Sequence, residues 1–201
     1  MRYRRWIAVF LLMPGMAHAH AAFVGAGDFY AGALHPLTSP EHILLLLVCG
    51  LWLGQQGRSR STFSLAWFPL AALAGAFWSQ RFDSAPDITS WVVAVALLMG
   101  ALLALAKALP RSVLLLLVLL AGGVYGFANG GAREGQMAVY PFIAGVVLAA
   151  FLVLAYLLVI ADHLWRQPAG WIRIALRVLG SWAVAISMLT LTLAARGMVS
   201  L

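Results

Sequence analysis

Charged residues are scarce in this chain. Only 9% of its 201 residues are Asp, Glu, Lys or Arg, whereas 64% are apolar. Soluble domains carry about 25% charged residues, so this chain has too few charges to cover a water-facing surface. The scarcity excludes an ordinary soluble domain and leaves almost no length for one beside the membrane segments. The composition therefore predicts an all-α fold, a polytopic bundle of membrane helices in a lipid bilayer.

Other features are missing as well, and each absence excludes a class of function. The single cysteine, Cys49, lies inside an apolar run, which rules out a disulfide framework and a cysteine-based zinc site. The net charge is +7, but the basic residues are scattered between apolar runs, so no nucleic-acid partner is expected. The chain has no nucleotide-binding P-loop, no His-Glu-x-x-His motif and no serine-nucleophile motif. We therefore expect neither an enzyme nor a self-contained ATP-driven pump.

Residues 1–19 have the pattern of a secretory signal peptide. Three arginines precede a short apolar stretch at residues 6–13, and Ala17-His18-Ala19 then supplies the small-x-small cleavage pattern. An uncleaved first membrane helix is disfavoured, because this stretch is far shorter than the ~20 residues that span a bilayer. Residues 20–201 then form a single transmembrane domain, with His20 at the mature N-terminus outside the cytoplasm.

Six apolar runs follow, and each is close to the length that crosses a bilayer. They occupy residues 40–54, 62–80, 88–108, 112–130, 137–161 and 171–195. With the mature N-terminus outside, seven basic residues face the cytoplasm: Arg58, Arg60, Lys107, Arg111, Arg166, Arg173 and Arg177. The outer side keeps only Arg81, Arg133 and Arg196, in agreement with the positive-inside rule. The sequence thus predicts six spans in a bacterial inner membrane, with both mature termini on the periplasmic side.

Ionisable residues near the predicted spans are few, and several have an ordinary explanation. Asp83 and Asp87 lie in a short outer loop, where solvated charges are common. Asp162 and His163 end the fifth span beside Trp165 on the cytoplasmic side, which indicates an interfacial anchor. We therefore do not expect these residues to carry the function.

A dense ionisable cluster directly precedes the first span, in the segment from His35 to His42. Either residue of Thr38-Ser39 can cap a helix that has Pro40 at its first position. This places Glu41 and His42 in the first helical turn, on the outer side. The helix dipole alone would favour a carboxylate there, but it does not explain the two histidines.

A bent approach to the first span could bring the imidazoles of His35 and His42 together, because Pro36 and Pro40 disfavour one continuous helix. Two imidazoles and the Glu41 carboxylate, with no thiolate beside them, suit a borderline divalent transition metal. Cobalt, nickel, copper and zinc all fit this description. The spacing thus indicates a metal site formed by these three ligands.

The run Gly25-Ala-Gly-Asp-Phe-Tyr-Ala-Gly-Ala-Leu-His-Pro36, followed by Glu41-His42, carries a family resemblance. It resembles the opening of the HupE/UreJ proteins, hydrogenase and urease accessory membrane proteins that are regarded as nickel or cobalt permeases. Their pattern is a glycine-rich lead and then His-Pro-x-x-Gly-x-Asp-His, so Ser39 replaces the glycine here and Glu41 the aspartate. The signal peptide, the mature chain that opens with histidine and the six spans extend the resemblance along the chain.

A second family motif, roughly His-Gly-x-Ala-His-Gly-x-Glu near the outer end of the fourth span, is only partly present. Residues 127–134 read Phe-Ala-Asn-Gly-Gly-Ala-Arg-Glu, so both histidines are missing and Glu134 remains. Glu134 is either a metal ligand or an ion-pair partner of Arg133, whose charge would disfavour a nearby cation. The imidazole and free α-amine of His20 form a further potential chelate. The candidate metal ligands are thus His35, Glu41, His42, Glu134 and His20.

The resemblance implies a permease or facilitator that passes a divalent ion inward. Nickel or cobalt is the expected cargo, and copper or zinc also suits these ligands. No permanently bound cofactor is expected. The alternative is an accessory or sensor protein that binds the metal for metalloenzyme maturation without transporting it. The implied partners are the metal ion, the lipid bilayer, metalloenzyme maturation proteins and further copies of the chain as a homo-oligomer.

We predict that the mature protein begins at His20, because the cleavage pattern follows a short apolar stretch. N-terminal sequencing, or the intact mass of the protein extracted from membranes, should therefore give residues 20–201. A retained Met1 would contradict the predicted cleavage.

Overall fold

The chain folds into a bundle of helices, described by a computed structural model over residues 27–82, 85–133 and 136–198. The predicted signal peptide, His20 and Glu134 lie outside these residues. All regular structure in the described ranges is α-helical. The helices are α2 (Asp28–Thr38), α3 (Pro40–Gln55), α4 (Arg58–Ser61), α5 (Ser64–Ser79), α6 (Thr89–Leu105), α7 (Arg111–Gly131), α8 (Val139–Trp165) and α9 (Gly170–Ala195).

Each predicted span coincides with one of the long helices. Residues 58–79, α7, α8 and α9 are each long and apolar enough to cross a membrane. Helices α2 and α3 pass the same test together, as a pair bent by 77°, and α6 is shorter, with 17 residues. The predicted all-α membrane bundle is therefore confirmed, and the protein is a multi-pass membrane protein. The count of six spans stays a prediction.

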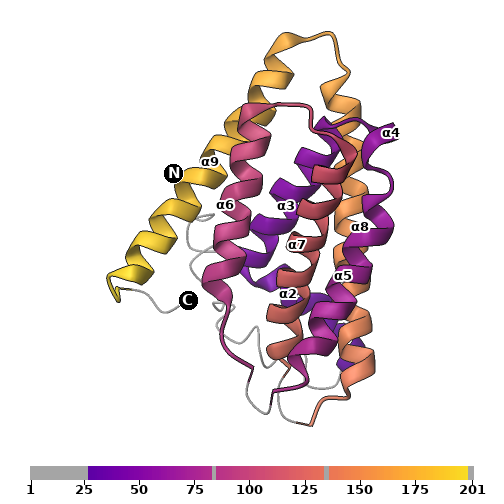
Figure 1. Cartoon of the computed structure of the whole chain (residues 1–201), viewed down its shortest axis with the longest axis vertical. Helices are drawn as coiled ribbons and strands as arrows, with labels where there is room; N and C mark the ends of the chain where they lie inside the picture. The colour runs from indigo at the N-terminus through magenta and orange to yellow at the C-terminus, as the bar shows by residue number, and fades with distance from the viewer. Residues whose placement is uncertain (1–26, 83–84, 134–135, 199–201) are drawn as a thin grey trace, which may run out of the picture.

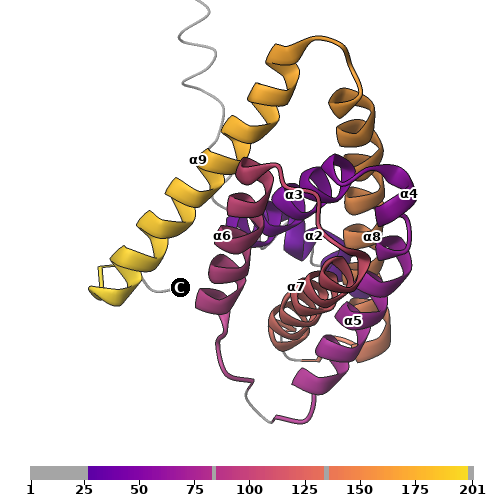
Figure 2. The same ribbon diagram turned by 45° about the horizontal axis from the view of Figure 1, so that its top comes forward.

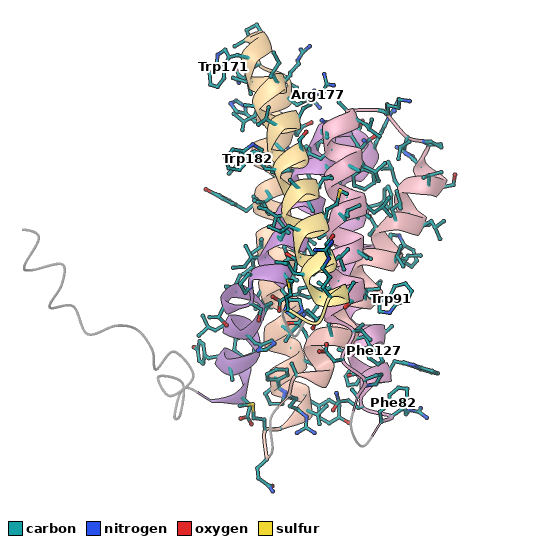
Figure 3. The ribbon with its side chains drawn as sticks, turned by 90° about the vertical axis from the view of Figure 1, so that its left-hand side faces the viewer. Phe82, Trp91, Phe127, Trp171, Arg177 and Trp182 are labelled. Atoms are coloured by element: carbon teal, nitrogen blue, oxygen red, sulfur yellow. The ribbon has the colours of Figure 1, made fainter. Side chains whose placement is uncertain are left out.

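Helix α3 occupies the middle of the bundle. Figures 1 and 2 show α6 and α9 on one side of it and α5, α7 and α8 on the other. Helix α9 packs mainly on α6, and its tryptophans Trp171 and Trp182 project away from the bundle (Figure 3). These two side chains are 70% and 67% exposed, as expected of a helix whose outer face meets lipid.

The two ends of the bundle are formed by different segments of the chain. Helix α2, the α5–α6 connection and the α7–α8 connection lie together at one end, which we name the α2 end (lower end in Figure 1). At the opposite end, Asp162 binds Arg166 at 2.9 Å and accepts a hydrogen bond from the backbone N–H of Arg58. Asp162 thus ties α8 to the start of α4, and its predicted role as an interfacial anchor stays a prediction.

Helix α2 is fixed against α8 by a reciprocal glycine contact. A Cβ atom added at Gly32 would lie 2.0 Å from a backbone oxygen of α8, and one added at Gly145 would lie 2.0 Å from a backbone oxygen of α2. Small residues allow helix backbones in membranes to approach this closely. The Asp28 carboxylate adds a hydrogen bond of 2.8 Å from the N–H of Ala138, which directly precedes α8. These contacts set the position of α2 across the end of the bundle.

Helices α5 and α7 also pack through glycine. A Cβ atom added at Gly126 would lie 2.0 Å from the backbone oxygen of Ala72, so the two helices touch along their backbones there. The next part of α7 towards the α2 end is the part that reaches the candidate site described below. The glycine contact therefore sets how closely α7 approaches that site.

We predict that Gly126→Ala destabilises the protein, because its Cβ atom would overlap the α5 backbone and force the helices apart. Overpacking of this kind costs about 1–3 kcal/mol of unfolding free energy. Gly123→Ala is the matched control on the same helix, since a Cβ atom at Gly123 meets nothing within 4 Å. Thermal unfolding in detergent checks both variants, and equal unfolding temperatures would contradict the close packing.

Candidate metal site

The predicted site residues lie at a sharp bend between α2 and α3. Helix α2 ends at Thr38, Ser39 has an extended backbone (φ −98°, ψ 113°), and α3 begins at Pro40. Proline at the first helical position is favourable because its missing N–H has no intrahelical partner there. The bend brings the ring centroids of His35 and His42 to 5.9 Å from each other. The predicted approach of the two imidazoles is thus present.

The local chemistry of the bend differs from the prediction in two respects. Pro36 lies inside α2 rather than ending it, and the break falls at Ser39. Neither Thr38 nor Ser39 caps α3 with its side chain. Both hydroxyls instead donate a hydrogen bond of 3.0 Å to the backbone oxygen of His35. They satisfy a carbonyl of the last turn of α2, which has lost its helical donor.

His42 is the most unusual side chain at the bend. Its residue is 4% exposed, and neither ring nitrogen has a hydrogen-bond partner among the described residues. Its ring lies edge-on to that of Tyr125 in α7, with centroids 5.7 Å apart. A buried polar group without a partner costs about 1–3 kcal/mol. The hydrogen-bonding capacity of the buried His42 imidazole is therefore unused within the described residues.

A half-open cavity of about 290 Å³ lies beside His42. One wall is the bend, with His35, Ser39, Glu41 and His42. The second wall is the segment 85–89 that leads into α6, and the third is formed by three small residues at positions 128, 131 and 132 near the end of α7. The cavity therefore joins three parts of the sequence at the α2 end of the bundle.

The charge of the cavity wall is negative. Glu41 and Asp87 line it, and no Lys or Arg does so among the described residues. Arg133, expected to disfavour a cation nearby, does not line the cavity. Its guanidinium donates hydrogen bonds to the side-chain oxygen of Gln80 at 3.4 Å and to the backbone oxygen of Met137 at 2.6 Å. The cavity is thus suited to a cation.

The cavity brings His35, Glu41 and His42 together without forming a closed coordination set. Within residues 27–82, 85–133 and 136–198, no three His, Cys, Asp or Glu side chains are placed to hold a metal ion. Glu134 and His20 lie outside these ranges. Two imidazoles and a carboxylate still supply the donor types that nickel and cobalt accept.

Asp87 is the site residue that sequence reasoning missed. Asp87 is an exposed residue of the α5–α6 connection, as the sequence indicated, and it also lines the cavity wall formed by the segment that leads into α6. Its Oδ1 accepts hydrogen bonds from the N–H of Thr89 at 2.9 Å and from the Thr89 hydroxyl at 2.6 Å. The signal for this position is an Asp-x-Thr turn directly before the third predicted span, at the same predicted membrane face as His35 and His42.

Comparison with known proteins agrees with the resemblance noted in the sequence. Residues 8–191 match the family described as "HupE / UreJ protein". The chain is 25% identical over 177 residues to "Protein HupE" of Rhizobium leguminosarum bv. viciae. The aligned residues make up 88% of this chain and 90% of that protein. No solved structure matches the chain significantly.

We predict that His42→Leu leaves the metal-free protein as stable as the parent or more stable, because it removes buried nitrogen atoms that lack partners. The rise in unfolding temperature that Ni²⁺ gives the parent should be lost, since a ligand stabilises only the state that binds it. Unfolding is measured in detergent, with chelator and with Ni²⁺.

His163→Leu is the control for this prediction. His163 lies in the last turn of α8, where its Nε2 is 2.9 Å from Nε2 of Gln167, so this variant should keep the Ni²⁺-dependent shift. A His42→Leu protein that unfolds well below the parent in chelator would show that the imidazole makes a structural contact instead.

Proposed function

Because the chain belongs to the HupE/UreJ family, we propose that it is a facilitator that passes a divalent transition-metal ion, nickel or cobalt, into the cytoplasm. The ion is the cargo, and the protein needs a gradient or a separate partner to drive transport, since the chain carries no P-loop. The name of the Rhizobium relative, Protein HupE, supports a link to the hydrogenase and urease accessory proteins named above.

The observation that carries this proposal is His42. In a chain so poor in polar residues, burying an imidazole with both nitrogens unpartnered is costly, and intramembrane ionisable groups usually mark an ion or substrate pathway. His42 lines a cavity together with His35 and Glu41, so a cation there would find two nitrogen donors and a carboxylate. Those donors suit nickel and cobalt better than magnesium or calcium, which prefer oxygen.

The loop charges support an orientation of the protein in the membrane, and with it an inward direction of transport. The arginines and lysine predicted on the cytoplasmic side lie at or near the end of the bundle opposite the α2 end, where α4 begins with Arg58 and α7 with Arg111. The positive-inside rule then puts the α2 end in the periplasm, for a protein in the bacterial inner membrane. The cavity accordingly faces the compartment from which the ion comes, with six spans and both mature termini on that side.

Besides His42, few buried side chains of the described residues have an oxygen atom without a hydrogen-bond partner. Asn129 and Ser187 are fully buried, and the side-chain oxygen of each lacks a partner among the described residues. Gln55, near the other end of α3, has a buried side-chain oxygen in the same condition. We propose that these oxygens, which lie on α7, α9 and α3, contact the ion or its water as it crosses the bundle. Binding at each step must stay weak enough for release.

A non-transporting accessory or sensor role is the second candidate. It is favoured by the packing just inward of His42, where Leu45, Leu46 and Trp52 are each no more than 1% exposed. A protein that only binds metal would saturate at a stoichiometric amount. A facilitator would continue to accumulate the ion inside vesicles or cells.

We predict that His42→Ala and Glu41→Gln each reduce Ni²⁺ uptake into proteoliposomes at least tenfold, because each removes a donor or a charge at the point of capture. Glu41→Asp should retain uptake, because it keeps the carboxylate. His163→Ala should stay close to the parent. All variants are compared at equal amounts of inserted protein.

Two outcomes would contradict this account. A His35→Ala/Glu41→Ala/His42→Ala variant that accumulates nickel and cobalt as fast as the parent would show that the bend is not on the pathway. Parent protein that stops at a stoichiometric amount of metal would favour the accessory or sensor role.

A further inference from the structure

We propose that Asp87 is the second capture carboxylate of this site, and that it holds the arriving divalent cation through the ion's water shell. This inference rests on the proposed function. It adds a residue from the α5–α6 connection to a site otherwise formed by the α2–α3 bend. Three observations support it: the position of Asp87, the hydrogen bonds that its two carboxylate oxygens do and do not accept, and the size of the cavity.

The position of Asp87 follows from the packing of α3 beside α6. Near one end of the pair, Gln55 of α3 donates a hydrogen bond of 3.1 Å to the backbone oxygen of Leu103 in α6. The two helices run in the same direction, so their first turns also lie together at the α2 end. The start of α3 carries Glu41 and His42, and the residues just before α6 carry Asp87. All three line the same cavity, on two of its walls.

The two oxygens of Asp87 are used differently. Oδ1 accepts both hydrogen bonds from Thr89, which fixes the carboxylate at the start of α6. Among the hydrogen bonds of the described residues, none ends on Oδ2. That oxygen is therefore available to accept a hydrogen bond from a metal-bound water molecule, with the carboxylate already oriented.

The cavity is large enough to admit a hydrated ion. Six water molecules occupy roughly 180 Å³ at their liquid volume, and the cavity measures about 290 Å³. Carboxylates on two walls, from Glu41 and Asp87, can each accept hydrogen bonds from the water shell. The buried His42, whose ring nitrogens lack partners within the described residues, lines the same cavity, and one of its nitrogens can replace a water molecule as the ion moves inward. A wide site of this kind needs no preformed group of three ligands.

A purely structural role for Asp87 is separable from this one. Its hydrogen bonds with Thr89 form a turn directly before α6, and asparagine makes such an Asx turn as aspartate does. Asp87→Asn therefore removes the charge and keeps the turn. Asp28→Asn is the matched control: Asp28 also accepts a backbone N–H, from Ala138 at the same end of the bundle, but it does not line the cavity.

The test is the kinetics of Ni²⁺ uptake into proteoliposomes by the full-length protein. Asp87→Asn should raise KM for Ni²⁺ about fivefold while kcat changes less than twofold, as expected when one charge several ångströms from the ion is lost. Asp87→Glu should recover most of the parent's KM. Asp28→Asn should leave both constants within twofold of the parent.

The outcomes separate this inference from the proposed function. If the parent takes up Ni²⁺ and Asp87→Asn has the parent's KM, the role of Asp87 is refuted and the facilitator stands. An equal rise of KM in Asp28→Asn also refutes it, because the effect would then be a general loss of surface charge. If the parent takes up no metal, the proposed function fails, and this inference with it. Should Asp87→Asn not insert, Asp87→Ser, whose hydroxyl can make the same kind of turn without the charge, is measured in its place with the same expected rise.

Discussion

The cost of an unpartnered polar group inside an apolar bundle is the constraint on which the rest of this structure depends. Within the membrane, backbone and side-chain polar atoms cannot rely on water, and a buried group without a partner costs about 1–3 kcal/mol. The bundle avoids this cost in most places: Gln56 bonds to the backbone of Lys107 and Leu109, and Asp162 bonds to Arg166. His42 stands apart, since both of its nitrogens lack a partner within the described chain and both belong to a residue on a cavity wall.

Close helix contacts hold that cavity open at one end of a tightly packed molecule. Gly32 and Gly145 let α2 cross the end of the bundle against α8, and the bend at Ser39 then directs α3 into the core. Gly126 sets the approach of α7 to α5. The residues that line the cavity on the α7 side are small, so the cavity is wide there. The candidate site is consequently a wide cavity that two carboxylates and the buried imidazole of His42 line.

Much of this architecture could be predicted from the sequence, because apolar runs and their breakers define membrane helices directly. The helices, the bend near Pro40 and the approach of His35 to His42 all follow from local patterns of this kind. The position of Asp87 beside the α2–α3 bend was not predicted, since it depends on how closely α3 and α6 pack against each other, which no local pattern records. Two sets of hydrogen bonds likewise depend on neighbours in three dimensions. Arg133 donates to Gln80 and Met137, and the hydroxyls of Thr38 and Ser39 donate to the backbone of α2. His20 and Glu134 stay predictions, since they lie outside the described residues.

The most direct test of this account is the location of the ion itself. Crystals of the full-length protein soaked with Ni²⁺ would be measured on both sides of the nickel absorption edge, so that an anomalous difference map marks the metal alone. The account predicts a peak in the cavity between the α2–α3 bend and segment 85–89, within coordination or water-mediated distance of His42. A peak at the opposite end of the bundle beside His163, with none at the bend, would contradict it.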